Sequence, residues 1–149
     1  MLLALNKTVQ AVFDKAMYLI DAQNEQSGAT TGADTNEYKV RTVGILNVLL
    51  DAVYPASDTF HMNEDGTRPY LDDIVSFTDE LDLDARILRE VLPYGLAAKL
   101  LSEENPKLAN YFQQCYEEAL ATARYSRPAV IESIELPYGG IEYGEFSHW

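Results

Sequence analysis

Apolar residues recur at helical spacing in four separate stretches of the chain. Steps of three and four positions place such residues on one face of a helix, where they can pack into a core. The first stretch follows Asn6 or Thr8, either of which can cap a helix, and is expected to end near Gln23. The second follows Asp34 and Glu37, which have the spacing of a capping box. Its apolar face is wide, which indicates burial from several sides or a face shared with a neighbouring subunit.

The third and fourth stretches lie in the second half of the chain. Asp82 or Asp84 stands where a carboxylate can cap the third helix. Pro93 and Gly95 interrupt the leucine-rich turns of that helix, and because proline removes a backbone donor and glycine adds flexibility, we expect a kink there. Asn105 and the proline after it form a standard opening for the fourth helix.

Three other segments lack helical periodicity. Residues 24–35 are small and polar, which is typical of a loop. Residues 55–70 contain prolines and Asp-Gly, so they predict a long irregular or hairpin-like excursion. Residues 128–149 read as an extended arm with a turn, in the same domain unit as a helical domain over 1–127. The sequence thus predicts a mainly α fold: a bundle of about four helices, a long loop between helices 2 and 3, and an extended C-terminal arm.

Composition narrows the functional classes. The chain of 149 residues has 47% hydrophobic residues, which suits one folded domain in water. The first five residues are too short an apolar run for a signal peptide, and no run is long enough to cross a membrane, so neither export nor a membrane role is expected. The net charge of -13 makes a phosphate-binding surface improbable.

No residue pattern indicates catalysis, a cofactor or a metal. Cys115 stands on an apolar helix face and is expected to be a small buried hydrophobe. His61 with Glu64 and Asp65 matches no helical metal-ligand spacing. The acidic run over 72–84 is interpreted as a solvated face with a helix cap. We therefore predict that the protein is not an enzyme.

Aromatic residues fall into two groups. Phe13, Phe112 and Tyr116 lie on the apolar faces of expected helices and are predicted core residues. The aromatics of the arm follow the last helix among glutamates, and large aromatics are favoured anchors at protein interfaces. The predicted protein-interaction residues are Tyr138, Tyr143, Phe146 and Trp149.

Four segments share a pattern with a known protein family. They are Ile-Leu-Asn-Val-Leu-Leu-Asp-Ala-Val-Tyr-Pro at 45–55, Asp-Glu at 79–80, Val-Leu-Pro-Tyr-Gly-Leu-Ala-Ala at 91–98 and Tyr-Gly-Gly-Ile-Glu at 138–142. On these segments the stretch from residue 41 to residue 149 resembles the head–tail connector, or neck adaptor, proteins of tailed bacteriophages.

The resemblance implies a structural virion protein, assembled in the cytoplasm of the bacterial host. Copies of such a subunit form a ring, expected to be dodecameric, beneath the portal protein in the neck. Its other partners would be tail or stopper proteins, and DNA would pass through the ring without specific binding. The alternative is an acidic helical regulatory or DNA-mimic protein that binds a host or phage protein. Such a regulator would be a monomer or dimer, whereas a connector forms or joins a closed ring.

Overall fold

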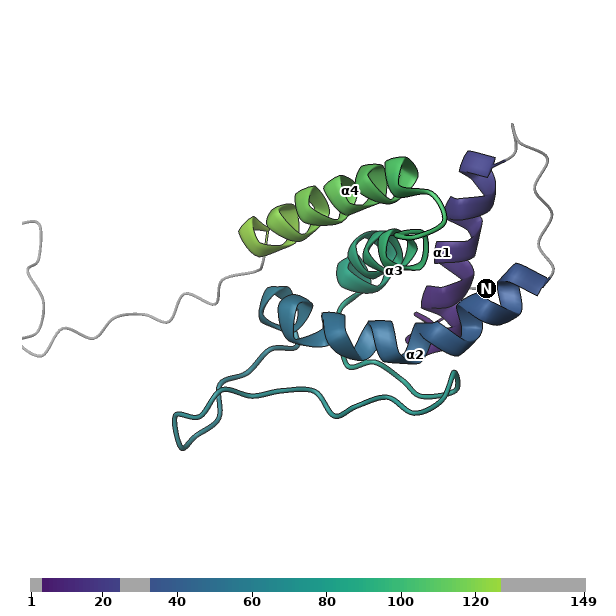
Figure 1. The fold of residues 1–149 in the computed structure, drawn as a ribbon. Coiled ribbons are helices and arrows are strands. Elements are labelled where there is room, and N and C mark those ends of the chain that lie inside the picture. The colour runs from purple at the N-terminus through teal and green to yellow at the C-terminus, as the bar shows by residue number, and fades with distance from the viewer. Residues whose placement is uncertain (1–3, 25–32, 127–149) are drawn as a thin grey trace, which may run out of the picture.

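The computed structural model describes residues 4–24 and 33–126, and this part of the chain is mainly helical (Figure 1). It contains no strand, and one isolated bridge pairs Thr8 with Glu80. The predicted four-helix, mainly α fold is confirmed. The elements are α1 (Val9–Asn24), α2 (Ala33–Val53), the short 3₁₀ helix η2 (Tyr54–Ala56), the π-helical turn η3 (Ile87–Val91), α3 (Leu92–Leu100) and α4 (Pro106–Tyr125).

Polar side chains begin three of these helical segments as the sequence predicts. Thr8 Oγ1, Asp84 Oδ1 and Asn105 Oδ1 each accept a hydrogen bond from the backbone N–H three residues further on, at 3.3, 3.0 and 3.2 Å. Each bond satisfies an N–H group that has no partner inside the helix. The predicted start of the second helix is two residues too late, because α2 begins at Ala33 and Asp34, the predicted cap, lies inside it.

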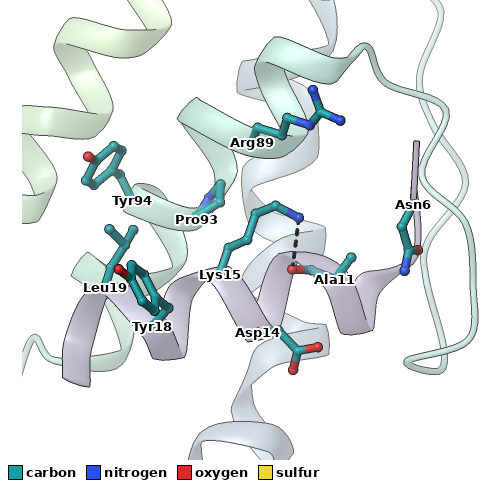
Figure 2. Close-up of a pocket in the computed structure, with 9 residues that line it drawn as sticks. All are labelled: Asn6, Ala11, Asp14, Lys15, Tyr18, Leu19, Arg89, Pro93 and Tyr94. Carbon is teal, nitrogen blue, oxygen red and sulfur yellow. Dashed lines mark hydrogen bonds between the residues drawn. The ribbon is translucent and has the colours of Figure 1, made fainter. Parts of the chain in front are cut away.

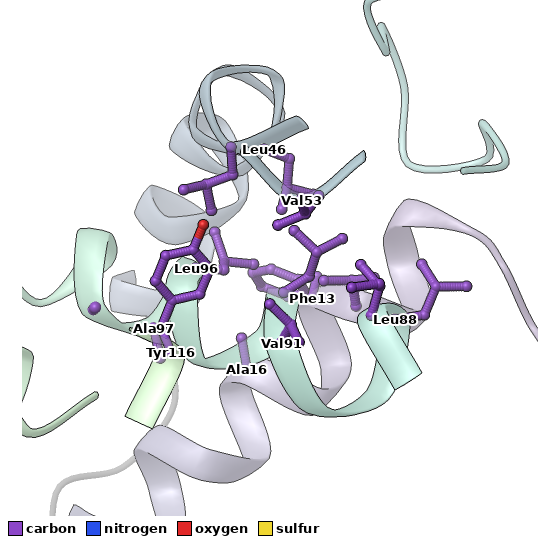
Figure 3. Packing of buried hydrophobic residues seen from close by; sticks show 14 of the residues in the cluster. Phe13, Ala16, Leu46, Val53, Leu88, Val91, Leu96, Ala97 and Tyr116 are labelled. Atoms are coloured by element: carbon purple, nitrogen blue, oxygen red, sulfur yellow. The ribbon is translucent and has the colours of Figure 1, made fainter. Parts of the chain in front are cut away.

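The core is built around α3, which packs against α1, α2 and α4 (Figure 1). Seven of its nine residues are buried, so little of the helix reaches solvent. Figure 3 shows side chains from α1 and α2 meeting those of η3 and α3 in one cluster. Phe13, Phe112 and Tyr116 are all buried in this core, as predicted.

The structure has a π-helical turn just before the position of the predicted kink. The N–H of Leu92 bonds to the carbonyl of Ile87, five residues back, which closes a π-helical turn ahead of Pro93. Proline has no N–H, and in a regular α turn its ring would crowd the carbonyl of Arg89, four residues back. A wider turn relieves that crowding, and such single π turns are known inside α-helices.

Gly95 marks a close contact between helices, a role that the sequence did not predict. A Cβ atom at this position would lie 2.9 and 3.0 Å from two ring carbons of Tyr116 and 3.1 Å from Cδ1 of Leu49. Carbon atoms normally sit about 3.5–4.0 Å apart. Glycine therefore lets α3 approach α2 and α4 closely.

The segment from residue 57 to residue 84 is a long ordered excursion that runs out from the helices and returns (Figure 1). It is longer than the predicted 55–70 excursion. At its outer end, the N–H of Gly66 bonds to the carbonyl of Asn63, and Gly66 has a φ of 84°, a conformation that suits glycine. On the return, the Asn47 side chain of α2 binds both backbone groups of Ile74, at 3.0 and 2.8 Å.

The same excursion completes the start of α1. The carbonyls of Asp79 and Phe77 accept the first two backbone N–H groups of that helix, both at 3.0 Å. The Asp79 carboxylate accepts the N–H groups of Val75 and Ser76 at 2.7 and 3.1 Å. These bonds, the one from Val75 first, hold the pKa of Asp79 below its usual value. The excursion is thus fixed to the helical body at two places.

Candidate protein-interaction site

A cleft of about 470 Å³ opens between α1 and the start of α3 (Figure 2). Its volume lies within the roughly 300–1,000 Å³ that is usual for binding pockets. The lining residues come from the segment before α1, from α1 itself, and from η3 and α3. They are Asn6, Ala11, Asp14, Lys15, Tyr18, Leu19, Arg89, Pro93 and Tyr94.

Two cationic side chains enter this cleft from opposite walls. Lys15 rises from α1 and Arg89 from η3, and Figure 2 shows both at the same end of the cleft. Lys15 Nζ donates to the carbonyl of Ala11 at 3.5 Å. Neither cation is within ion-pairing distance of an acidic side chain in the described residues. The lining contains one acid, Asp14, and its side chain points away from Lys15 and Arg89 (Figure 2). The two positive charges are therefore available to an anionic partner.

The other end of the cleft is aromatic. Tyr18 is exposed and Tyr94 is half-buried, with Leu19 beside them on α1 (Figure 2). The Tyr94 ring is supported from below by Phe112 of α4, at 6.2 Å between centroids. The residues that line the cleft include no His, Cys, Ser or Thr, so they offer no nucleophile and base pair. Two cations with two phenol rings suit the binding of an acidic, aromatic segment.

Sequence reasoning nominated no pocket and missed this cleft. Lys15 and Arg89 belong to helices that are far apart in the sequence, and each is an ordinary helical cation by itself. Only the packing of α1 against α3 brings them together. No local spacing could have revealed the pair.

The outer face of α2 is a second candidate surface. Val40 and Val48 are 83% and 74% exposed, and Gly44 and Ala52, at the same four-residue spacing, are exposed too. The opposite face carries buried residues such as Leu46. The wide apolar face that the sequence identified, broadened by Ile45 and Leu49, is packed into or against the core cluster, so the exposed stripe is a different face of the helix. Within the described part of the chain, this stripe is not covered.

The long excursion presents further apolar side chains to solvent. Met62, Tyr70 and Val75 are exposed although the backbone around them is ordered. A second hollow, of about 370 Å³, lies where the excursion returns past η2 and is lined partly by acids of the 72–84 run. An ordered loop with exposed apolar tips is usually functional.

Several other residues considered from the sequence as possible functional groups do not form a site in the described part of the chain. Cys115 was predicted to be buried, but its side chain is only partly buried. Its thiol is hydrogen-bonded to Tyr111, which raises the pKa of that phenol. His61 is exposed on the excursion. Across residues 4–24 and 33–126, no three His, Cys, Asp or Glu side chains are grouped so as to hold a metal ion.

The four predicted interaction residues of the arm, together with the 128–149 boundary, lie outside the described residues. Pro93 and Gly95 are both buried within α3. None of the helices in the described part is long and apolar enough to cross a membrane.

The chain matches no protein-family model, and it has no match among curated proteins or solved structures.

Proposed function

We propose that this protein is a structural assembly subunit rather than an enzyme, and that it serves as a head–tail connector that forms a ring beneath the portal of a tailed bacteriophage. The observation that carries the assembly role is the uncovered apolar stripe on α2, formed by Val40, Gly44, Val48 and Ala52. Burying a valine side chain gains up to about 1.5–3 kcal/mol. The stripe is therefore a favourable site for another protein surface.

The stripe also has room for close contact. A Cβ at Gly44 would meet nothing within 4 Å, so the backbone of α2 is open at the middle of the stripe. Helices pack at interaxial distances of about 8–10 Å, with small residues at the point of contact favouring the shorter distances. A partner helix could thus lie against α2 without displacing any side chain of the body.

Two distinct apolar surfaces favour a ring over a simple dimer. A two-fold dimer needs one self-complementary patch, whereas each subunit of a ring presents different patches to its two neighbours. The α2 stripe and the exposed apolar residues of the excursion, Met62, Tyr70 and Val75, provide two such patches. The net charge of -13 is compatible with DNA passing by without binding, because phosphates are repelled.

The phage assignment is supported by the resemblance of residues 41–149 to connector proteins. Part of that pattern, residues 45–55, extends along α2 into η2. The proposed partners are other copies of the chain, the portal protein and tail or stopper proteins, and the proposed location is the neck of the virion. No cofactor is assigned.

Light scattering and negative-stain electron microscopy of the purified chain, alone and with the portal protein, test this proposal. We expect closed rings, and we expect the double variant Val40→Asn/Val48→Asn to assemble poorly. Tyr125→Asn is the control, because Tyr125 is 91% exposed at the end of α4 and is not part of the stripe. A chain that stays a monomer or dimer even with the portal protein would contradict a connector and favour the acidic regulator.

A further inference from the structure

We infer that the cleft between α1 and α3 is the receptor for the C-terminal segment, residues 137–149, of a second copy of this chain. The inference rests on the proposed assembly role, which it deepens by naming one contact between subunits. Nothing in the resemblance to connector proteins assigns this cleft. It is carried by the charge of the cleft, by its aromatic lining and by the position of the C-terminal end of α4.

The charges of cleft and segment are complementary. The chain has 11 basic residues against 24 acidic ones, yet two of the basic residues, Lys15 and Arg89, converge on one cleft without an acidic partner in the described residues. From residue 128 to the end, the chain contains glutamates and no Lys or Arg. Glu142 and Glu145 stand close together within the segment and give it two carboxylates for two cations. Charge-assisted hydrogen bonds of this kind are the strong ones.

The apolar parts are complementary as well. Next to the two cations the cleft offers the rings of Tyr18 and Tyr94. In the segment, Tyr143 and Phe146 each directly follow one of the two glutamates, and Trp149 adds a third ring. The segment thus carries both kinds of group that the cleft can bind, carboxylates for its cations and rings for its aromatic end. Aromatic pairs and aromatic anchors in pockets contribute strongly to protein interfaces.

A second copy is favoured over the chain's own segment. Figure 1 shows the C-terminal end of α4 on the side of the molecule away from α1, so the chain continues from the far side. Residues 127–136, which connect α4 to the docked segment, can span roughly 33–36 Å at most. That length is ample to reach a neighbour placed beside that end of α4. The geometry then gives each subunit one cleft to offer and one segment to donate, which is the head-to-tail arrangement that closes into a ring.

Trp149 makes the contact measurable, because it is the only tryptophan of the chain. In the full-length assembled protein we expect its emission to be blue-shifted and shielded from acrylamide. The double variant Lys15→Gln/Arg89→Gln should expose Trp149 by weakening the contact roughly tenfold or more, as expected for lost hydrogen bonds to charged groups. Lys99→Gln/Lys107→Gln is the matched control, because both lysines are exposed, lie outside the cleft and carry the same total charge. The control should leave Trp149 shielded.

A mixing experiment tests whether the contact joins two copies. A tagged Trp149→Phe chain has an intact cleft and no tryptophan emission of its own, while the Lys15→Gln/Arg89→Gln chain keeps the tryptophan and lacks the cations. The two are mixed as monomers, concentrated and captured through the tag, so that any Trp149 signal comes from mixed assemblies. We expect the captured Trp149 to be shielded again. If the Lys15→Gln/Arg89→Gln chain is not captured, or is captured with Trp149 still exposed, the inference is overturned.

The remaining outcomes separate this inference from the proposed function. If rings form and Trp149 is equally shielded in the cleft variant and in the control, the segment docks elsewhere and the inference fails while the connector proposal stands. If the chain stays monomeric with Trp149 shielded in a cleft-dependent way, the segment occupies its own cleft, and both the second-copy inference and the ring are refuted. If the chain stays monomeric with Trp149 exposed, both are refuted as well.

Discussion

Replacing Gly95 by alanine should destabilise the protein, although the same change in a helix usually does the opposite. Alanine has the higher helix propensity, by about 1 kcal/mol. At this position, however, the new methyl group would lie 2.9 Å from a ring carbon of Tyr116 and 3.1 Å from Leu49. Both neighbours are buried, so neither can swing into solvent. Overpacking of this kind costs about 1–3 kcal/mol. We therefore expect a net loss of about 1 kcal/mol, and up to about 2 kcal/mol if the ring cannot shift.

The control for this variant is Gly44→Ala. Gly44 is also in the middle of a helix, but it is exposed and a methyl group there would touch nothing within 4 Å. Only the propensity gain remains, so Gly44→Ala should stabilise the monomer by up to about 1 kcal/mol. Thermal and guanidinium unfolding, followed by circular dichroism at a concentration where the chain is monomeric, should separate the two variants. In a chain of 149 residues, 1 kcal/mol corresponds to a shift in Tm of about 2–4 °C.

A second variant shows whether the steric reasoning is correct. Tyr116→Leu removes the ring atoms that an alanine at position 95 would meet. In the Tyr116→Leu background, Gly95→Ala should cost less than it does in the wild type, so that the two changes are coupled. If Gly95→Ala proves as stable as Gly44→Ala, the close approach of α3 and α4 is not what requires glycine, and the reasoning is refuted.

Three further predictions follow from the bonds around the excursion and η3. Asn47→Ala should unpair both backbone groups of Ile74, costing about 1–3 kcal/mol and increasing proteolysis of the excursion, whereas Asn63→Ala at its exposed turn should not. Because the folded pKa of Asp79 is lowered, its stabilising effect is complete above its unfolded pKa and lost as the pH falls through the folded one. Unfolding free energies measured between about pH 6 and about pH 2.5 should therefore fall less in Asp79→Asn than in the wild type, and equal falls would contradict this. Pro93→Ala supplies an N–H that can bond four residues back, so a structure of the variant should show a regular α turn, and a retained π turn would mean that proline is not its cause.

Local signals in the sequence predicted the helices and their starts well. Thr8, Asp84 and Asn105 cap helical segments through bonds to amides only three residues away. Interactions over such short distances depend on residue type and spacing, which a sequence displays directly. The periodic apolar positions predicted the helices for the same reason, and they identified Phe13 and Phe112 as core residues.

Contacts between distant parts of the chain were beyond that reasoning. Gly95 has the same local context whether it bends a helix or admits the ring of Tyr116, and only the packing of α4 decides between the two. The cleft likewise depends on Lys15 and Arg89 being brought together by the packing of α1 against α3. The extent of the ordered excursion depends on Asn47, whose two bonds to a distant backbone have no local signature.

Removing residues 137–149 should separate folding from assembly. The core cluster of the described residues runs from Val9 to Ala123 and is formed by the helices and the excursion. In this part of the chain, no buried side-chain nitrogen or oxygen lacks a hydrogen-bond partner. The body thus satisfies its own packing and polar groups, and we expect the truncation to change the monomer's unfolding free energy by less than about 0.5 kcal/mol, with the helical signal unchanged.

Assembly should respond differently, because the proposed contact loses its aromatic anchors and its carboxylates. Light scattering should show weaker ring formation by the truncated chain, and attachment to the phage neck should fall in a virion assembly assay. A full-length control with Tyr138, Tyr143, Phe146 and Trp149 replaced by serine distinguishes the loss of aromatic side chains from the loss of chain length. It should assemble as poorly as the truncated chain if burial of those rings drives the contact. Should the truncated chain lose its helical signal instead, the segment belongs to the core of its own subunit, and the interface lies elsewhere on the molecule.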